Sequence, residues 1–208
     1  MKKKITSKRI LLGLLAIFLA GAGIAFNSLS TLGNDSVALL YDGFRAGFHL
    51  DMDKLGIVSN TINLVLVIIV LLMYKKFINI GTLIYTVLLG TVISFVSNIY
   101  SMFNIPLTIM TKIILAICGC SLLYIGIGLY IAVNIGLDPV SAFEMSIAEK
   151  FRIKFSTSKI IFDFSSIIIG VLLGGKMGLL TIITALTAGF SIQFFANLFQ
   201  TRLFNIDC

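Results

Sequence analysis

The stretch Gly33-Asn34-Asp35-Ser36-Val37 recurs 103 residues later as Gly136-Leu137-Asp138-Pro139-Val140. Each copy follows a long apolar run, and each opens a short semi-polar segment with the pattern Gly-x-Asp. A pattern that returns at a fixed distance along a chain is the sign of a duplicated structural unit. The sequence is therefore predicted to fold as two halves with the same plan.

The alignment of the two halves extends well beyond this turn. At the same shift the chain matches itself without a gap from residue 9 to about residue 70, so that Phe48 aligns with Phe151. The last apolar run of each half rejoins at a shift of 99, where Thr82 and Gly90 align with Thr181 and Gly189. The two repeats are predicted to cover about 9–103 and 107–200.

The composition is that of a membrane protein. The 208 residues are 58% hydrophobic and only 12% charged, and the mean hydropathy is +1.07. A soluble domain has about 25% charged residues. Six apolar runs approach the roughly 20 residues that a membrane-spanning helix needs, at about 10–28, 55–74, 79–101, 107–133, 157–174 and 178–199. The chain is predicted to be all-α, a single polytopic transmembrane domain over residues 1–208, without room for a separate catalytic domain.

Three spans in each half imply that the halves are inverted. Because three is an odd number, the second half must enter the membrane from the side opposite to the first. Inverted repeats are common in secondary transporters, which bind their substrates near the midplane between the repeats. The sequence therefore predicts two inverted three-helix repeats, each with one extra short helix.

The distribution of basic residues predicts the orientation. Lys and Arg gather on the cytoplasmic side of membrane proteins. All but four of the 16 Lys and Arg fall on one side of the predicted topology, namely Lys2, Lys3, Lys4, Lys8, Arg9, Lys75, Lys76, Lys150, Arg152, Lys154, Lys159 and Arg202. Both termini are thus expected in the cytoplasm. The same bias explains the net charge of +7, and no nucleic-acid partner is expected.

The two short segments, at about 33–48 and 136–151, have the spacing of an apolar helical face. Val37, Leu40, Phe44 and Phe48 follow one another at steps of three, four and four, and the second copy keeps these steps. Asp35 and Asp138 are expected to be N-caps, and Pro139 stands where a first helical residue belongs. Two interpretations stay open: a helix on the bilayer surface, or a helix that re-enters the membrane.

Ionisable residues inside membrane spans are costly, so each is a candidate for function. Asp163 lies within the fifth span, and its repeat equivalent is Asn60. We expect these two residues to face one substrate or ion cavity. The alternative is that Asp163 pairs with Lys159, one turn earlier on the same helical face.

Further polar residues are weaker candidates for a substrate or ion site. Asp35 and Asp138 could bind a cation or proton, although capping is the favoured role. Asn27 and Asn134 end the first and fourth spans, and Gln193 lies in the last. Four glycines are expected at close helix contacts, namely Gly21, Gly23, Gly126 and Gly128.

No catalytic, metal or cofactor motif is present. The chain lacks G-x-S-x-G, H-E-x-x-H and P-loop patterns, and it has one His. Cys118 and Cys120 point to different helix faces, and Cys208 does not make a prenylation box. We therefore expect no enzyme, no bound metal and no cofactor.

Two segments resemble a known family. The stretch from Gly126 through Asn134, Gly136, Asp138 and Pro139 to Ala142 resembles the YczE/YyaS/YitT group of bacterial membrane proteins. The segment Gly178-Leu-Leu-Thr181, followed by Gly189, is similar to the last helix of that group. The first half departs from the pattern at Asn34 and Ser36. The resemblance implies a polytopic protein of a bacterial plasma membrane, but it implies no substrate and no mapped site.

These observations favour a small transporter or permease for an unknown small molecule or ion. Two alternatives remain: a non-transporting accessory or regulatory protein that acts through a partner, and a substrate-capture subunit of a larger importer. The expected partners are the lipid bilayer and the substrate, with a homo-oligomer or a membrane partner as further options.

Overall fold

The computed structural model describes residues 6–204, and these residues form eight α-helices and two short 3₁₀ turns. Lys2, Lys3, Lys4 and Cys208 lie outside the described residues. The helices are α1 Ser7–Ser30, α2 Ser36–Gly47, α3 Leu55–Met73, α4 Ile80–Met102, α5 Ile109–Val133, α6 Pro139–Phe151, α7 Phe155–Leu172 and α8 Leu179–Phe204, with 3₁₀ turns at Met52–Lys54 and Lys75–Phe77.

The prediction of six spans in an all-α fold is confirmed. Six segments are long and apolar enough to cross a membrane: α1, Met52–Met73, α4, α5, α7 and α8. The helices α2 and α6 have only 12 and 13 residues, too few to cross a bilayer. The order of the elements in the chain is therefore long, short, long, long in each half.

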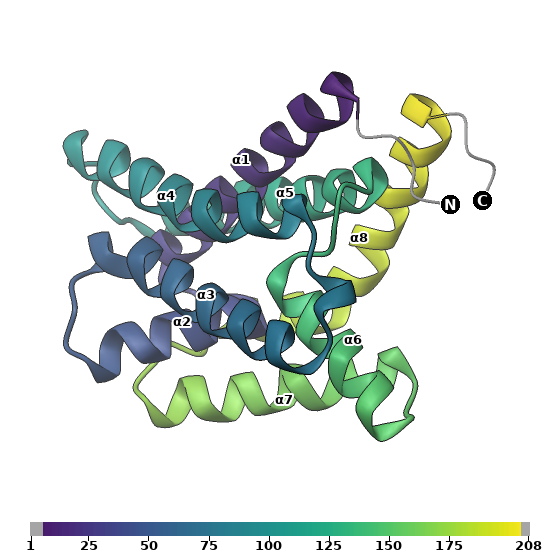
Figure 1. Cartoon of the computed structure of the whole chain (residues 1–208). Helices are drawn as coiled ribbons and strands as arrows, with labels where there is room; N and C mark the ends of the chain where they lie inside the picture. Colours follow the sequence, from purple (N-terminus) through teal and green to yellow (C-terminus); the bar gives the residue numbers. More distant parts are fainter. Residues whose placement is uncertain (1–5, 205–208) are drawn as a thin grey trace.

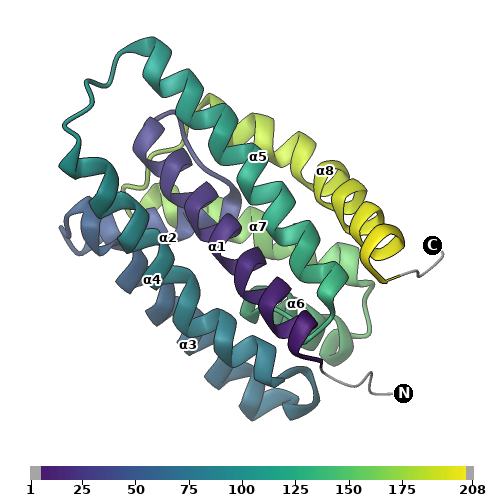
Figure 2. The same ribbon diagram turned by 90° about the horizontal axis from the view of Figure 1, so that it is seen from above.

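The long helices α4, α1, α5 and α8 form a row, and the other four helices lie beneath it. Figure 2 shows α1 between α4 and α5, with α8 on the far side of α5. Beneath the row each short helix packs against a long helix of the other half, α2 against α7 and α6 against α3. The halves therefore interlock.

Small residues allow the central helices to pack closely, as expected. A Cβ atom on Gly23 would lie 2.5 Å from the backbone nitrogen of Leu123, and one on Gly126 would collide with the backbone of Ala20. Gly21 meets Val92 of α4 in the same way, and Gly128 meets Phe195 of α8. In a bilayer such close packing is a main source of helix association.

The first and last helices meet at one end of the molecule. Lys8 Nζ donates to the carbonyl oxygen of Leu203 at 3.4 Å, and the Arg9 guanidinium lies 4.4 Å from the ring centre of Phe204. The short helices run in opposite directions in Figure 1: α2 ends at the left of the molecule and α6 ends at the lower right. The beginnings of α2 and α6 thus lie in the middle of the molecule.

The burial of α2 differs from the prediction. Of the expected apolar face, Leu40 is buried and Val37 and Phe44 are partly buried, but Phe48 at its end is 68% exposed. Burial also extends beyond this face, because Tyr41, Asp42, Gly43 and other residues around the whole helix are buried. Gly43 approaches Gly170 of α7 so closely that a Cβ there would lie 2.5 Å from the Gly170 carbonyl oxygen. The helix is thus enclosed by protein, which a sequence pattern alone does not reveal.

Candidate functional site

A cavity of about 440 Å³ lies in the middle of the helix bundle. Its lining comes from both halves of the chain, namely from α1, α2, α4, α5, α6, α7 and α8 together with the turns before α2 and α6. A volume of this size is typical of a pocket for a small molecule. The cavity is therefore the candidate site.

One wall of the cavity is acidic. Its members come from α2, α6 and α7 and from the caps of the first two, and we call them the acidic wall: Asp35, Asp138, Glu144, Lys159 and Asp163. Four carboxyl groups thus face one amino group. A site with this excess of carboxylates has the electrostatic character of a cation site.

The two caps behave as the sequence predicts. Oδ1 of Asp35 accepts a hydrogen bond from the Ala38 backbone N–H at 2.7 Å, and Oδ1 of Asp138 accepts one from Ser141 at 3.0 Å. Pro139 occupies the first helical position. Both aspartates nevertheless line the cavity as well, so capping does not remove them from it.

Two threonines hold these caps in place, each across the boundary between the halves. Thr82 of α4 donates its hydroxyl to the carbonyl oxygen of Leu137 at 2.6 Å, directly before Asp138. Thr181 of α8 accepts the backbone N–H of Asn34 at 3.1 Å, directly before Asp35. Each half therefore positions the short helix of the other half.

Asp163 pairs with Lys159 and also faces the cavity. Its Oδ2 lies 3.1 Å from Lys159 Nζ, so the predicted pairing one turn apart is confirmed. Its Oδ1 accepts a hydrogen bond of 2.6 Å from the Ser36 hydroxyl of the other half. Lys159 Nζ also lies 3.7 Å from Oε1 of Glu144. A single amino group thus bridges two carboxylates of the acidic wall.

The opposite wall is aromatic and apolar. Three tyrosines face the cavity from the row of long helices, Tyr85 from α4 and Tyr124 and Tyr130 from α5. The rings of Tyr85 and Tyr130 lie 5.0 Å apart in an edge-to-face arrangement. We call this the aromatic wall; its apolar members include Ile24, Leu89, Leu123, Ile127, Ala188 and Ile192.

Two buried polar atoms on the cavity lack a hydrogen-bond partner in the described part of the chain. They are Oε1 of Glu144 and the hydroxyl of Tyr130. Glu144 is only 1% exposed and Tyr130 only 3%. Burial raises the pKa of Glu144 to about 7, against the opposing effect of Lys159, and burial likewise raises the pKa of Asp35. Unpaired buried polar groups are costly, so each calls for a partner.

The structure separates the predicted site residues into two groups. Asp35, Asp138, Asp163 and Gln193 line the cavity. Asn60, Asn27 and Asn134 do not, so the expectation that Asn60 faces the same cavity as Asp163 is wrong. The amide of Asn60 instead bonds to α4, donating to the Val87 carbonyl at 3.0 Å and accepting from Gly90 N–H at 2.8 Å.

Asn27 and Asn134 lie outside the cavity and have structural roles. Asn27 is fully buried between α1 and α5, where a Cβ on Gly119 would collide with its amide. Asn134 ends α5 in the left-handed conformation with φ 52°, which asparagine adopts more readily than most residues. Gln193 donates to Asn197 Oδ1 at 2.6 Å on its own helix.

Glu144 and the tyrosines were missed by sequence reasoning. Glu144 lies beside the predicted apolar face of its segment and looks there like an ordinary polar residue of an amphipathic helix. The one available signal is its position six residues after the Asp138 cap, which places it within two turns of the same helix end. No sequence pattern marks the tyrosines as site residues, because apolar helices commonly contain aromatic residues.

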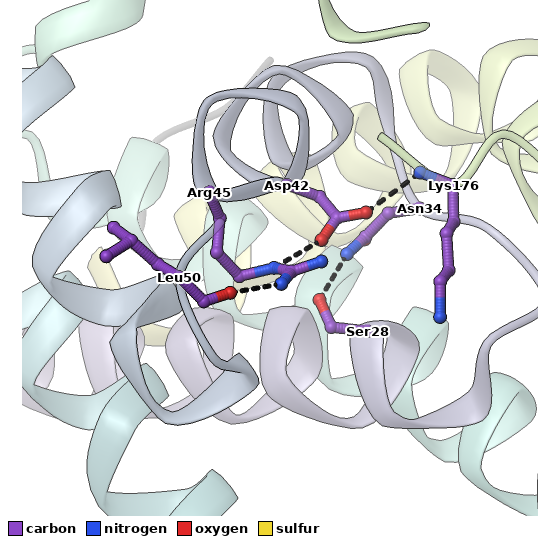
Figure 3. Close-up of polar contacts among 6 residues, drawn as sticks. All are labelled: Ser28, Asn34, Asp42, Arg45, Leu50 and Lys176. Atoms are coloured by element: carbon purple, nitrogen blue, oxygen red, sulfur yellow. Dashed lines mark hydrogen bonds and ion pairs between the residues drawn. The ribbon is translucent and has the colours of Figure 1, made fainter. Parts of the chain in front are cut away.

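A second polar group, outside the cavity, fixes the far end of α2. Asp42 Oδ1 lies 2.8 Å from Arg45 Nε, and Asp42 Oδ2 accepts the backbone N–H of Lys176 at 2.8 Å. Arg45 in turn donates to the Leu50 carbonyl at 2.6 Å. Figure 3 shows Asp42 between Arg45 and the backbone of Lys176, with the hydrogen bond from Asn34 to Ser28 nearby. This group joins α2 to the turn between α7 and α8.

Comparison with known proteins gives a family and a distant relative. Residues 7–197 match the model of a family of unknown function, DUF6198. An uncharacterized protein of Haemophilus influenzae is 26% identical over 191 residues, which cover 92% of this chain and 84% of the relative. No solved structure matches the chain.

Proposed function

Because the chain belongs to the DUF6198 family of unknown function, we propose its function from the geometry of the central cavity. The protein is a small transporter of a bacterial plasma membrane, with both termini in the cytoplasm. Its two halves are inverted repeats, at about 9–103 and 107–200, and they bind a small molecule or ion between them. The short helices α2 and α6 re-enter the membrane from opposite sides.

The observation that supports this most strongly is the meeting of both short helices at one cavity. The capped N-termini of α2 and α6 line the same space, and the two helices leave it toward opposite ends of the molecule (Figure 1). Discontinuous helices that meet at a central site are a feature of transporters with inverted repeats.

A difference between the two halves supports alternating access. In the first half α3 and α4 are in close contact, since a Cβ on Gly90 would collide with the Gly56 carbonyl. In the second half a Cβ on the equivalent Gly189 would meet nothing within 4 Å. The cavity lies between α7 and α8 at this point, lined by Asp163 and Gly189. If the α3–α4 junction opened and the α7–α8 junction closed, access to the cavity would move to the other face of the membrane.

The experiment is a test of access to the cavity from both sides of the membrane. Ser141 lines the cavity, so Ser141→Cys places a thiol there in a variant whose three native cysteines are replaced by Ala. A membrane-impermeant maleimide is applied to intact cells and to inside-out vesicles. The control is Ser59→Cys, because Ser59 is fully buried and is not part of the cavity lining.

If the protein is a transporter, Ser141→Cys should be labelled from both sides of the membrane and Ser59→Cys from neither. An accessory or regulatory protein predicts no labelling from either side, and its function would then depend on a partner. A substrate-capture subunit predicts labelling from the outer side only, together with copurification of ATPase subunits. Either of the last two results would overturn the proposal.

A further inference from the structure

We propose that the cavity binds a small organic cation, whose protonated amine contacts the acidic wall and whose apolar body lies against the aromatic wall. This inference rests on the proposed function and specifies its substrate class. The argument depends on four features of the cavity: its charge, its unpaired atoms, the spread of its carboxylates and the contrast between its two walls.

The charge of the cavity favours a cation over an anion. The acidic wall has four carboxyl groups and one amino group, that of Lys159. A helix N-terminus usually favours an anion. Here, however, Asp35 and Asp138 already occupy the N-termini of α2 and α6. An anionic ligand would therefore meet carboxylates where it would otherwise meet backbone N–H groups.

The unpaired oxygen of Glu144 needs a partner that donates hydrogen bonds. Oε1 of Glu144 is a buried acceptor without a hydrogen bond in the described part of the chain, and its ion-pair partner, Lys159 Nζ, is 3.7 Å away. A protonated amine offers up to three N–H donors to such an oxygen. Lys159 demonstrates the fit, because its amino group already lies 3.1 Å from Asp163. The ligand's ammonium would supply Glu144 with the close contact that Lys159 does not make.

The spread of the carboxylates argues against a metal ion. Among residues 6–204 no three His, Cys, Asp or Glu side chains come together as metal ligands. Calcium and magnesium need several oxygen atoms within about 2.6 Å of one point. Carboxylates spread along one wall of a cavity of about 440 Å³ instead suit a ligand with a body of its own.

The aromatic wall suits the rest of an organic cation. Tyr85, Tyr124 and Tyr130 line this wall, and aromatic rings attract cations and pack well against apolar groups. Ile127 and Ile192 add apolar contacts on the same wall. A ligand with one charged end and one apolar end can satisfy both walls at once, which a hydrated inorganic cation cannot.

The test compares amines with matched molecules of other charge. The full-length protein is purified in detergent, and its unfolding temperature is recorded with phenethylamine, benzylamine and cyclohexylamine. Phenylacetate, benzyl alcohol, NaCl and MgCl₂ are the comparison compounds. The same amines are added during maleimide labelling of Ser141→Cys, where a bound ligand slows the reaction.

Two variants remove a negative charge with little change in shape. Glu144→Gln removes the unpaired carboxylate, and Asp138→Asn keeps an N-cap residue of equal quality. The matched control is Glu149→Gln, because Glu149 pairs with Lys76 on the surface at 2.6 Å and lies outside the cavity.

We expect at least one amine to raise the unfolding temperature and to slow labelling, and we expect no such effect from phenylacetate or MgCl₂. Glu144→Gln and Asp138→Asn should weaken the amine response at least tenfold, and Glu149→Gln should leave it unchanged. The proposal is overturned if no amine acts, if phenylacetate acts as strongly, or if both cavity variants respond like the parent. If Ser141→Cys still labels from both sides in that case, transport stands and only the substrate class is wrong.

Discussion

Asn60 fastens α3 to α4, whereas Asp163, its equivalent in the second half, faces an open cavity between α7 and α8. The Asn60 amide makes two hydrogen bonds to the α4 backbone, at Val87 and Gly90. Asp163 makes none to α8 and bonds instead to Ser36 and Lys159. Equivalent polar residues thus occupy a closed and an open junction in one molecule.

The glycines at these two junctions should respond differently to the same substitution. Gly90→Ala is expected to lower the free energy of unfolding by about 1–3 kcal/mol, because its Cβ would collide with Gly56 and Asn60. Gly189→Ala meets no atom within 4 Å and should gain up to about 1 kcal/mol from helix propensity. Denaturant unfolding in detergent measures both. If transport requires α7 and α8 to close, Gly189→Ala should slow transport without loss of stability. Equal destabilisation by Gly90→Ala and Gly189→Ala would contradict the open junction between α7 and α8.

Removal of the Asn60 amide should weaken the first half. Asn60→Ala loses both interhelical hydrogen bonds, which are worth about 0.6 kcal/mol each on average in membrane proteins, so a loss of about 1 kcal/mol is expected. Thr61→Ala is the control, since the Thr61 hydroxyl bonds only within its own helix, to Ile57 at 2.9 Å. Equal unfolding temperatures for the two variants would show that Asn60 does not hold this junction.

The Asp42 group should matter far more than a surface ion pair. The side chains of Asp42 and Arg45 are only 9% and 11% exposed, and removal of one partner from a buried pair costs about 3–5 kcal/mol. Asp42→Asn is therefore expected to lower the unfolding temperature strongly. Asp53→Asn, which breaks the exposed pair with Lys54 at 2.9 Å, should cause no measurable shift. The prediction fails if the two variants unfold at the same temperature.

The pH dependence should have opposite signs for stability and for amine binding. Burial raises the pKa of Glu144 to about 7 from its ordinary value of 4.5, with Lys159 opposing and Asp138 and Asp163 adding to the rise. Because the fold favours the neutral acid, Glu144 contributes to the free energy of unfolding at low pH. This contribution is complete below pH 4.5 and is lost as pH rises through 7. Amine binding needs the carboxylate and should weaken up to tenfold per pH unit below 7. Titration of both quantities in Glu144→Gln should show neither trend; an unchanged pH profile in this variant would assign the effect to another group.

Much of the fold was predictable because its signals are local or periodic. The six spans follow from the length of apolar runs, and the caps at Asp35 and Asp138 follow from the Gly-x-Asp pattern at the repeat. The pairing of Lys159 with Asp163 follows from helical spacing alone. Each of these features depends on residues close together in the chain.

The site was only partly predictable because it depends on packing between distant segments. The repeat suggested that Asn60 and Asp163 would face one cavity, but α3 lies against α4 while α7 does not lie against α8. Glu144 reaches the cavity because α6 packs between α3 and α7, which no local pattern shows. The cross-bonds from Thr82 and Thr181 likewise connect residues more than 50 positions apart.

The most direct test of the account concerns the opposite orientation of the two halves. Asp51 and Lys154 are exposed residues at equivalent positions, 103 apart, in the links before α3 and α7. Each is replaced by Cys in the variant without native cysteines, and intact cells are treated with a membrane-impermeant maleimide. Inverted halves predict that Asp51→Cys is labelled in intact cells and that Lys154→Cys is labelled only after the membrane is opened. Labelling of both residues from the same side would contradict the inverted repeat and the transport mechanism built on it.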